Sequence, residues 1–422
     1  MEFSVCFLGI DQAPVKLAYI DPGTGTLLLS MLIGAVSVLI YRFRNSLLKM
    51  KYSFHLNGVK EEEGFPIAVF SDDKRYWTTF KPICDEFEKR GQKVIYLTQS
   101  KDDPAFDQEY SHVKCEYIGR GQSAFAKLNF LKADIVLSTT PSLDVYQWKR
   151  SKDVKYYVHV LHAANDVTCY RMFGIDYYDA IILSGAFQID QIRKLEKLRG
   201  LKEKELPVLG LPYLDEMKKQ KNFRERVHEK KTVLLAPSWG KNGILSKYGS
   251  RMIDALLSSG YHVVIRPHPQ SFVSEAEMID ELMSRYPESD QLEWNRDNDN
   301  FDVLSRSDIL ISDFSGVIFD FSLVFDRPII YALDSFDDSV YDAWWLKEDL
   351  WTIKILPKLG IQLKDENIAD IAVTIGECID SDALKKTRRE VREECWANCG
   401  ESASLIADYL LQKQKELSEN NR

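Results

Sequence analysis

Two histidines stand where an apolar run of the sequence gives way to a loop. His162 follows the run 156–161, and His268 follows the run 261–267, two residues after Arg266 and between two prolines. A histidine whose pKa lies near neutrality can accept the proton of an alcohol at cellular pH, which suits His162 to the role of a general base. The prolines stiffen the turn, so His268 and Arg266 form a donor pair suited to a diphosphate. For each histidine the alternative is a structural role in the fold.

A second candidate site is a serine- and glycine-containing segment at 312–316. It precedes the apolar helical pattern 317–321, so Ser315 and Gly316 are expected to open a helix. The free N–H groups and the positive dipole end of such a helix can bind an anion. The alternative is ordinary N-capping by Ser315 or Asp313, which is compatible with anion binding because both use the same terminus.

A third candidate is the loop 236–243, which follows another predicted strand. Ser238 and Lys241 are candidates for contacts to ligand phosphates, although Gly, Asn and Lys populate most loops. The sequence contains no GxxxxGK[ST] phosphate loop, GxGxxG fingerprint, HExxH helix or GxSxG elbow. Several common active-site architectures are thereby excluded.

Apolar runs alternate with helical patterns from Gly64 onward, which is typical of parallel strands covered by helices on both faces. The fold class is therefore α/β, with two Rossmann-like domains whose strand ends face a cleft. The predicted strands cover 66–70, 93–97, 134–138, 156–161, 179–183, 207–211, 232–237, 261–267, 308–312 and 327–332.

The stretch 213–231 is dense in charge of both signs and poor in core-forming residues, which indicates a domain boundary. Beyond Asp382 the pattern is helical and suits a tail that packs back across both domains. The predicted organisation is a membrane anchor with its basic flank at 1–56, an N-terminal Rossmann-like domain at 57–212, a charged linker at 213–231, a C-terminal Rossmann-like domain at 232–381 and a helical tail at 382–422.

The composition excludes some classes of partner. The net charge is −9 and the isoelectric point is near 5.5, whereas binding to nucleic acid requires a concentrated basic face. We therefore expect no nucleic-acid partner. The seven cysteines are scattered, which favours reduced thiols in a cytoplasmic protein over a disulfide or zinc framework.

The span 22–41 contains no charged residue and is followed by Arg42, Arg44, Lys49 and Lys51. Twenty residues is roughly the length that a helix needs to cross ~30 Å of hydrocarbon. The basic flank predicts a single-pass protein of the cell membrane whose large C-terminal part faces the cytoplasm. A buried core helix, a signal peptide and a partly inserted segment are the alternatives.

The motifs APSW, RPHP and SDFSGVIFDFSLVFDRPIIY, taken together in this order, resemble the C-terminal domain of the CDP-glycerol glycerophosphotransferases. These enzymes prime and polymerise teichoic-acid-type polymers. The resemblance is strongest from Leu235 to Tyr331 and extends more weakly back to VLHAAND. The family's SDYSS reads SDFSG here, so that Gly316 replaces a serine, and the family's HGTP reads HAAN.

This resemblance implies a GT-B fold, with an acceptor-side N-terminal domain and a C-terminal domain for the donor nucleotide. It implies that His162 deprotonates an acceptor hydroxyl, which attacks the β-phosphate of a CDP-linked alditol and releases CMP. His268 and Arg266, the Ser315 and Gly316 amides, Asp313 and the Ser238 to Lys241 loop would hold the donor. We expect no metal or other cofactor; the expected partners are the nucleotide-activated donor, a lipid-linked or polysaccharide acceptor, and the membrane.

Two other functions remain open from the sequence alone. One is a GT-B glycosyltransferase that uses the same diphosphate contacts but directs attack to the anomeric carbon of a nucleotide sugar. The other is a membrane-tethered protein that binds nucleotide or polymer without turnover.

Overall fold

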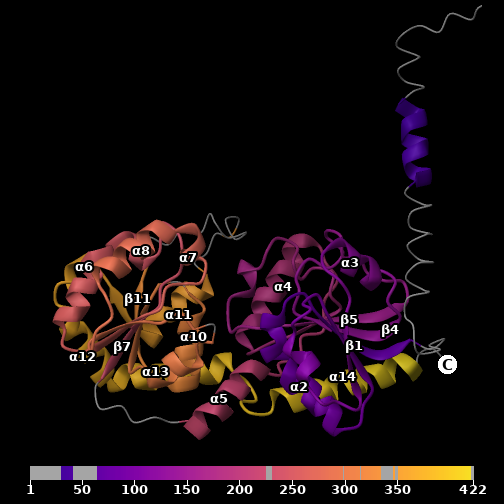
Figure 1. Ribbon diagram of the computed structural model, residues 1–422. Coiled ribbons are helices and arrows are strands. Elements are labelled where there is room, and N and C mark those ends of the chain that lie inside the picture. The colour runs from indigo at the N-terminus through magenta and orange to yellow at the C-terminus, as the bar shows by residue number, and fades with distance from the viewer. Residues whose placement is uncertain are drawn as a thin grey trace, which may run out of the picture. The chain divides into compact units, whose positions relative to one another are not determined.

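The computed structural model describes residues 30–40, 64–224, 231–297, 299–313, 315–333, 346 and 350–419. Contacts divide the chain into a unit at 1–60 and a unit at 61–422, and the second contains both sheets. Each sheet has six parallel strands (Figure 1). The strands of the first sheet are β1 (Phe65–Ser71), β2 (Val94–Thr98), β3 (Val113–Tyr117), β4 (Ala133–Ser138), β5 (Val154–Val160) and β6 (Ala180–Ile182). Those of the second are β7 (Thr232–Leu235), β8 (His262–Ile265), β9 (Leu292–Trp294), β10 (Ile309–Ser312), β11 (Ile329–Ala332) and β12 (Gly360–Leu363).

The two sheets share one topology, β3-β2-β1-β4-β5-β6 and β12-β11-β10-β7-β8-β9. In the first, Ile67 of β1 aligns with Val94 of β2 on one side and Ile135 of β4 on the other. The strand order therefore reverses beside β1, and in the second sheet it reverses beside β7. Ligands of doubly wound sheets bind at the carboxyl ends of the strands at such switch points, which predicts where each half of a site should lie.

Helices cover both faces of each sheet, as the apolar runs predicted (Figure 1). Successive β1 residues alternate between the two faces: Val69 packs in the cluster that includes α2 residues, whereas Phe70 packs in the cluster that includes α3 residues. The helices are α2 (Trp77–Lys89), α3 (Gln122–Leu128), α4 (Phe187–Arg199), α5 (Pro212–Arg224), α6 (Ile244–Ser258), α7 (Ser271–Ser274), α8 (Ala276–Arg285), α9 (Phe301–Arg306), α10 (Val317–Phe319), α11 (Trp351–Leu359), α12 (Ile371–Asp380), α13 (Asp382–Cys395) and α14 (Ser402–Glu419). Short helical turns are η1 (Lys74–Tyr76), η2 (Pro104–Asp107), η3 (Val167–Cys169), the π-helical η4 (Asp320–Val324) and η6 (Asp365–Asn367).

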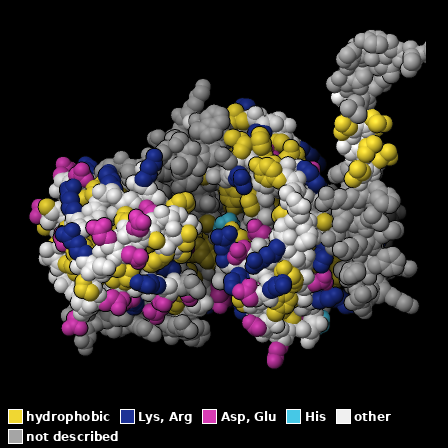
Figure 2. All heavy atoms as spheres, turned by 45° about the horizontal axis from the view of Figure 1, so that its top comes forward, with side chains coloured by type: hydrophobic (Ala, Val, Ile, Leu, Met, Phe, Trp, Pro, Cys, Tyr) yellow, Lys and Arg dark blue, Asp and Glu magenta, His cyan; other side chains and the backbone are white. Residues whose placement is uncertain are grey.

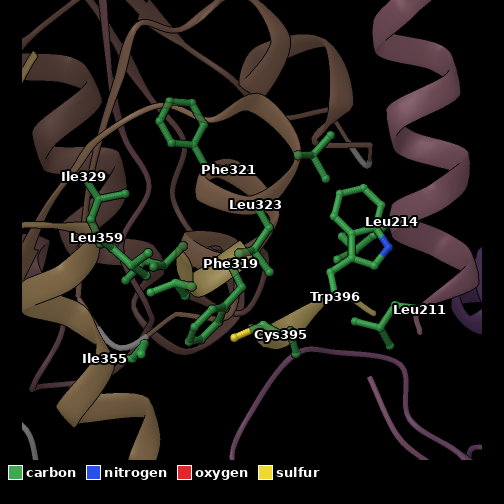
Figure 3. Packing of buried hydrophobic residues seen from close by; sticks show 14 of the residues in the cluster. Leu211, Leu214, Phe319, Phe321, Leu323, Ile329, Ile355, Leu359, Cys395 and Trp396 are labelled. Atoms are coloured by element: carbon green, nitrogen blue, oxygen red, sulfur yellow. The ribbon is translucent and has the colours of Figure 1, made fainter. Parts of the chain in front are cut away.

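One hydrophobic cluster joins residues from the two sheet-bearing halves. It contains Leu161 and Leu211 from the first half and Phe319 and Leu359 from the second, together with Trp396 of the tail. Figure 3 shows part of this cluster, including Trp396 near Leu211 and Cys395 near Phe319. Shared burial of this kind stabilises the contact between the halves at roughly 25 cal/mol per Å² of apolar surface removed from water.

The C-terminal tail runs from the second half back to the first. Between α13 and α14 the chain passes so close to Gly210 that an added Cβ would lie 2.2 Å from the Ala397 carbonyl oxygen, and Gly210 has a φ of +94°. The buried Asp215 carboxylate accepts hydrogen bonds from Trp396 Nε1 at 2.8 Å and from the Ser402 amide at 2.9 Å. Helix α14 then packs against α2 on one face of the first sheet.

Several sequence expectations differ from the structure. Segment 207–211 is not a strand and makes only an isolated bridge, Leu183 to Val208. Strands β3, β9 and β12 were not predicted. The predicted linker 213–231 contains most of helix α5, and the predicted domain bounds themselves stay a prediction.

The predicted membrane segment 22–41 falls partly outside the described residues, which show a helix at 30–40. Its apolar side chains are exposed (Figure 2), with Leu39 at 65% and Met31 at 62%. Within the part of the chain that the structure describes, no helix has both the length and the apolar character needed to cross a membrane.

Candidate functional site

His162 lies two residues after the end of β5, at the carboxyl edge of the first sheet. Its Nδ1 is 2.8 Å from Thr139 Oγ1, which follows β4, and its ring centroid is 4.9 Å from that of Tyr76, which ends η1 after β1. Thr140 Oγ1 donates a hydrogen bond to Asp72 Oδ1 at 2.9 Å. The ends of three adjacent strands therefore gather these polar groups at the predicted switch point.

His162 is held in its neutral form. Burial, followed by the nearby positive charge of Arg75, lowers the pKa of His162 to about 4. The neighbouring His159 is completely buried, and burial lowers its pKa to about 3. A neutral His162 can accept a proton at pH 7, although its low pKa makes it a weaker base than an ordinary histidine.

The tautomer of His162 depends on its contact with Thr139. If His162 Nδ1–H donates to Thr139 Oγ1, the ring's Nε2 carries the lone pair that a base needs. If the threonine hydroxyl donates instead, Nε2 carries the proton and is unable to accept another. Base catalysis by His162 therefore requires the Nδ1–H tautomer, with Thr139 as acceptor.

Asp313 organises the second sheet's part of the site. It lies directly after β10, is 1% exposed, and accepts hydrogen bonds from the Ser238 amide at 2.9 and 3.0 Å and from the Ile244 amide at 3.3 Å. Burial raises the pKa of Asp313, and the bonds from Ser238 and Ile244 oppose that rise. Asp313 therefore anchors the loop after β7, and its oxygens are already occupied by that loop.

His268 lies on the loop after β8, and its tautomer is defined by the backbone. The Gln270 amide donates to His268 Nδ1 at 3.1 Å, so the neutral ring carries its proton on Nε2. Burial and then the Arg266 charge lower the pKa of His268, while Asp313 and Glu275 oppose that effect. His268 can thus offer Nε2–H to an anionic oxygen.

Glu275 interacts with His268 and with the loop after β7, although no sequence motif marks it. Its carboxylate accepts a hydrogen bond from Ser246 Oγ at 2.7 Å and another from the Gly240 amide. These bonds and the charge of His268 oppose burial and lower the pKa of Glu275. The sequence does not predict this contact, because Glu275 lies 35 residues after Gly240 and an acidic residue before a helix is common.

The remaining predicted residues occupy the same edge of the second sheet. Arg266 donates from Nη2 to the Asp297 carbonyl oxygen at 3.0 Å, and burial lowers the pKa of Arg266. Lys241 is exposed on the loop after β7, and Ser315 is half-buried before α10. A Cβ added to Gly316 would meet no atom within 4 Å, so the space beside this residue is open.

The structure therefore divides the predicted site between the two sheets. His162 lies at the first, and the seven other predicted residues lie at the second. Ser238 and Asp313 are brought together by hydrogen bonds, and Arg266, His268 and Asp313 interact electrostatically. The catalytic and binding roles of all eight residues stay predictions.

The turn after Ser315 carries a buried carboxyl group with an unusual proton affinity. Asp320 accepts a hydrogen bond from the Tyr213 hydroxyl and another from the Asn300 side chain, while burial raises the pKa of Asp320 to about 6. The folded state therefore binds a proton more tightly than the unfolded chain does. This difference stabilises the fold below about pH 4 and is lost as the pH rises through about 6.

We expect Asp320→Asn to remove this pH dependence while keeping an acceptor for the Tyr213 hydroxyl. We compare the free energies of unfolding of wild type and variant at each pH. The wild-type value minus the variant value should fall by on the order of 1–3 kcal/mol from pH 4 to pH 7. Urea denaturation at the two pH values measures this, with the surface variant Asp302→Asn as control. Parallel pH profiles for wild type and Asp320→Asn would refute the assignment.

The family comparison covers the second half of this site. Residues 174–343, less than half of the chain, match the model of the family described as CDP-Glycerol:Poly(glycerophosphate) glycerophosphotransferase. This segment is similar to that family. The matched segment includes His268 and Asp313. His162 lies upstream of the matched residues. Among curated proteins no sequence matches the chain significantly.

Solved structures show the same fold. The wall teichoic acid polymerase TagF with CDPG has a TM-score of 0.57 at 16% identity, covering 93% of this chain and 98% of that chain. The MnaA protein of S. aureus with UDP has a TM-score of 0.57 at 14% identity, covering 83% and 97%. The UDP-GlcNAc 2-epimerase of Methanocaldococcus jannaschii has a TM-score of 0.54 at 11% identity, covering 82% and 100%. The two-sheet GT-B-like architecture is confirmed by these likenesses.

The expected independence from metal stays a prediction. Within the described ranges, no three His, Cys, Asp or Glu side chains group closely enough to hold a metal ion.

Proposed function

We propose that this protein transfers an alditol phosphate, such as glycerol phosphate, from a CDP-linked donor to an acceptor hydroxyl in the synthesis of a cell-surface polymer. The observation that carries the proposal is the glycerophosphotransferase match over 174–343, which contains the His268, Asp313 and Ser315 loops. The likeness to TagF, studied with CDPG, supports the same class of donor.

In the proposed reaction, the acceptor hydroxyl forms a bond to the β-phosphorus of the donor. Its proton passes to His162 Nε2, while the bond from that phosphorus to the bridging oxygen breaks and CMP leaves with the electron pair. His268 Nε2–H and the Arg266 guanidinium stabilise the negative charge on the phosphates. Such preorganised donors are usually the largest contribution to catalysis.

A comparison of donors tests the proposal. The full-length protein should bind CDP-glycerol in calorimetry more tightly than UDP-GlcNAc, and it should release CMP when a poly(glycerophosphate) acceptor is present. The likeness to a UDP-GlcNAc 2-epimerase makes UDP-GlcNAc the appropriate control, because the same fold binds a UDP-linked sugar in that protein. Binding of UDP-GlcNAc without binding of CDP-glycerol would favour the nucleotide-sugar glycosyltransferase instead.

We also propose that the N-terminal segment attaches the protein to the cell membrane, with both sheets in the cytoplasm. The uncharged span 22–41, its basic flank and the exposed apolar side chains of helix 30–40 support this placement. A lipid-linked acceptor would then lie in the same membrane as the enzyme that extends it.

A protein fusion tests this topology. We expect a C-terminal reporter to be active only in the cytoplasm, and the full chain to sediment with membranes. Deletion of residues 1–50 should release a folded protein, because the cores begin beyond Gly64. A reporter active only outside the cytoplasm would overturn the proposal.

A further inference from the structure

Asp166 lies four residues after His162 and forms two reciprocal hydrogen bonds with the start of helix α11. Its Oδ2 accepts from the Trp351 amide at 2.7 Å, and its own amide donates to Thr352 Oγ1 at 3.4 Å. The contact joins the two halves of the molecule, because Asp166 follows the first sheet's β5 and α11 follows the second sheet's β11. The two reciprocal bonds resemble a capping box, but the capping carboxylate comes from the other half of the molecule.

Asp166 supplies what α11 lacks locally. Trp351 is the first residue of α11, and Leu350 before it provides no side-chain cap. The first N–H groups of a helix have no partner within the helix, and a carboxylate there also interacts favourably with the helix dipole. Asp166 is 3% exposed, so water does not compete effectively for these bonds.

The other oxygen of Asp166 holds its own loop. Asp166 Oδ1 accepts from the Thr168 amide at 2.8 Å and from Thr168 Oγ1 at 2.5 Å. Helix α4 holds the loop on both sides, because Gln188 donates to the Asn165 carbonyl oxygen and Gln191 accepts from the Val167 amide. The carboxylate thus joins a rigid loop to α11.

Trp351 extends the connection to the donor side. Its ring stacks on Phe187 of α4, with centroids 4.0 Å apart, and on Phe319 of α10, with centroids 5.8 Å apart. Helix α10 directly follows Ser315 and Gly316. A single residue therefore contacts both the helix that supports the His162 loop and the helix that follows the predicted phosphate loop.

We propose that Asp166 is a positioning residue that sets His162 against the donor by capping α11 from the opposite half of the molecule. The expected effect on kcat rests on the proposed transfer reaction. The hydrogen bonds from α11 to Asp166 do not depend on any substrate. A misplacement of a catalytic group by about 1 Å can cost roughly 10²-fold in rate.

The test compares Asp166→Ala with Asp103→Ala. Asp103 is a matched control because it is 2% exposed and caps η2 by accepting from the Ala105 amide, entirely within the first half. Hydrogen exchange at the Trp351 amide reports the cap without substrate. We expect Asp166→Ala to accelerate that exchange roughly 5- to 30-fold, and Asp103→Ala to leave it unchanged.

The kinetic arm uses CMP release from CDP-glycerol with a poly(glycerophosphate) acceptor. We expect Asp166→Ala to lower kcat about 10-fold or more while the Kd for CDP-glycerol, from calorimetry, changes less than about threefold. The Asp103→Ala variant should have the kcat of the wild type when both are measured at a temperature where the variant is folded. A purely structural Asp166 would instead lower the fraction of folded protein and leave the kcat of that fraction intact.

A gentler variant keeps the proposal testable if Asp166→Ala fails to fold. Thr352→Val removes only the reciprocal bond and should change exchange and kcat in the same direction by a smaller factor. Unchanged exchange at Trp351 in folded Asp166→Ala, or unchanged kcat in both variants, would overturn the proposal. If wild type neither binds nor turns over CDP-glycerol, the proposed function fails, and the exchange experiment still decides whether the cap exists.

Discussion

Replacing His162 with alanine should lower kcat by about 10²–10⁴ while changing the affinity for a CDP-linked donor little. The residue lies at the first sheet, whereas the predicted donor contacts lie at the second, so the variant should lose proton transfer and keep donor binding. Steady-state CMP release and calorimetry with CDP-glycerol measure the two quantities separately.

Two further variants sharpen this prediction. Thr139→Val removes the partner of His162 Nδ1 and should lower kcat by a smaller factor, because the favoured tautomer is no longer held. His112→Ala is the control, since this half-exposed histidine pairs with Glu88 instead. Because the pKa of His162 is lowered to about 4, protonation of this residue should not reduce kcat/KM between pH 8 and pH 6. Near wild-type turnover in His162→Ala would eliminate it as the base.

The second large effect is expected for His268→Ala, which should weaken donor binding as well as turnover. Loss of one preorganised donor to developing charge costs about 10²–10³ in rate. The backbone bond from Gln270 places the proton on His268 Nε2, where a phosphate oxygen could accept it. Calorimetry with CDP-glycerol and CMP-release kinetics give the two effects.

The control for His268 is a histidine at the other end of β8. His262 begins β8, at the opposite edge of the sheet, and its Nδ1 lies 3.3 Å from the Asp290 carbonyl oxygen. His262→Ala should leave the Kd for CDP-glycerol unchanged. Equal losses of donor affinity in both variants would show that the effect comes from the stability of β8 and its following loop and not from contact with the donor.

The strands and helices with strong local patterns could be predicted from the sequence. Phe80 and Phe87 recur at a spacing typical of a helix before a glycine, and the structure forms α2 there, followed by Gly91 with a φ of +65°. Strands β9 and β12 were missed because three or four residues, such as Leu292–Trp294, give too short a run for periodicity to register. Segment 207–211 has strand-like residues but adds only one bridge beside β6, so its backbone pairing depends on tertiary placement.

The site could be predicted only in part, for a similar reason. Individual residues at strand ends, such as His162 and His268, stand out because they interrupt apolar runs. Their partners do not, because Thr139 and Tyr76 precede His162 by 23 and 86 residues and reach it only through the parallel order of β1, β4 and β5. The sequence also predicted Asp313 as a contact to the donor, and only the structure shows that its oxygens hold the Ser238 loop.

The return of helix α14 to the first sheet affects the order in which the chain can fold during synthesis. Ile406 and Leu410 belong to the same apolar cluster as Ile67 and Val69, yet the ribosome makes them more than 330 residues later. Contacts so distant in sequence form slowly, because a long loop must close before they stabilise anything. One face of the first sheet therefore stays incompletely covered in the nascent chain, and that domain completes its core only after nearly the whole protein has been translated.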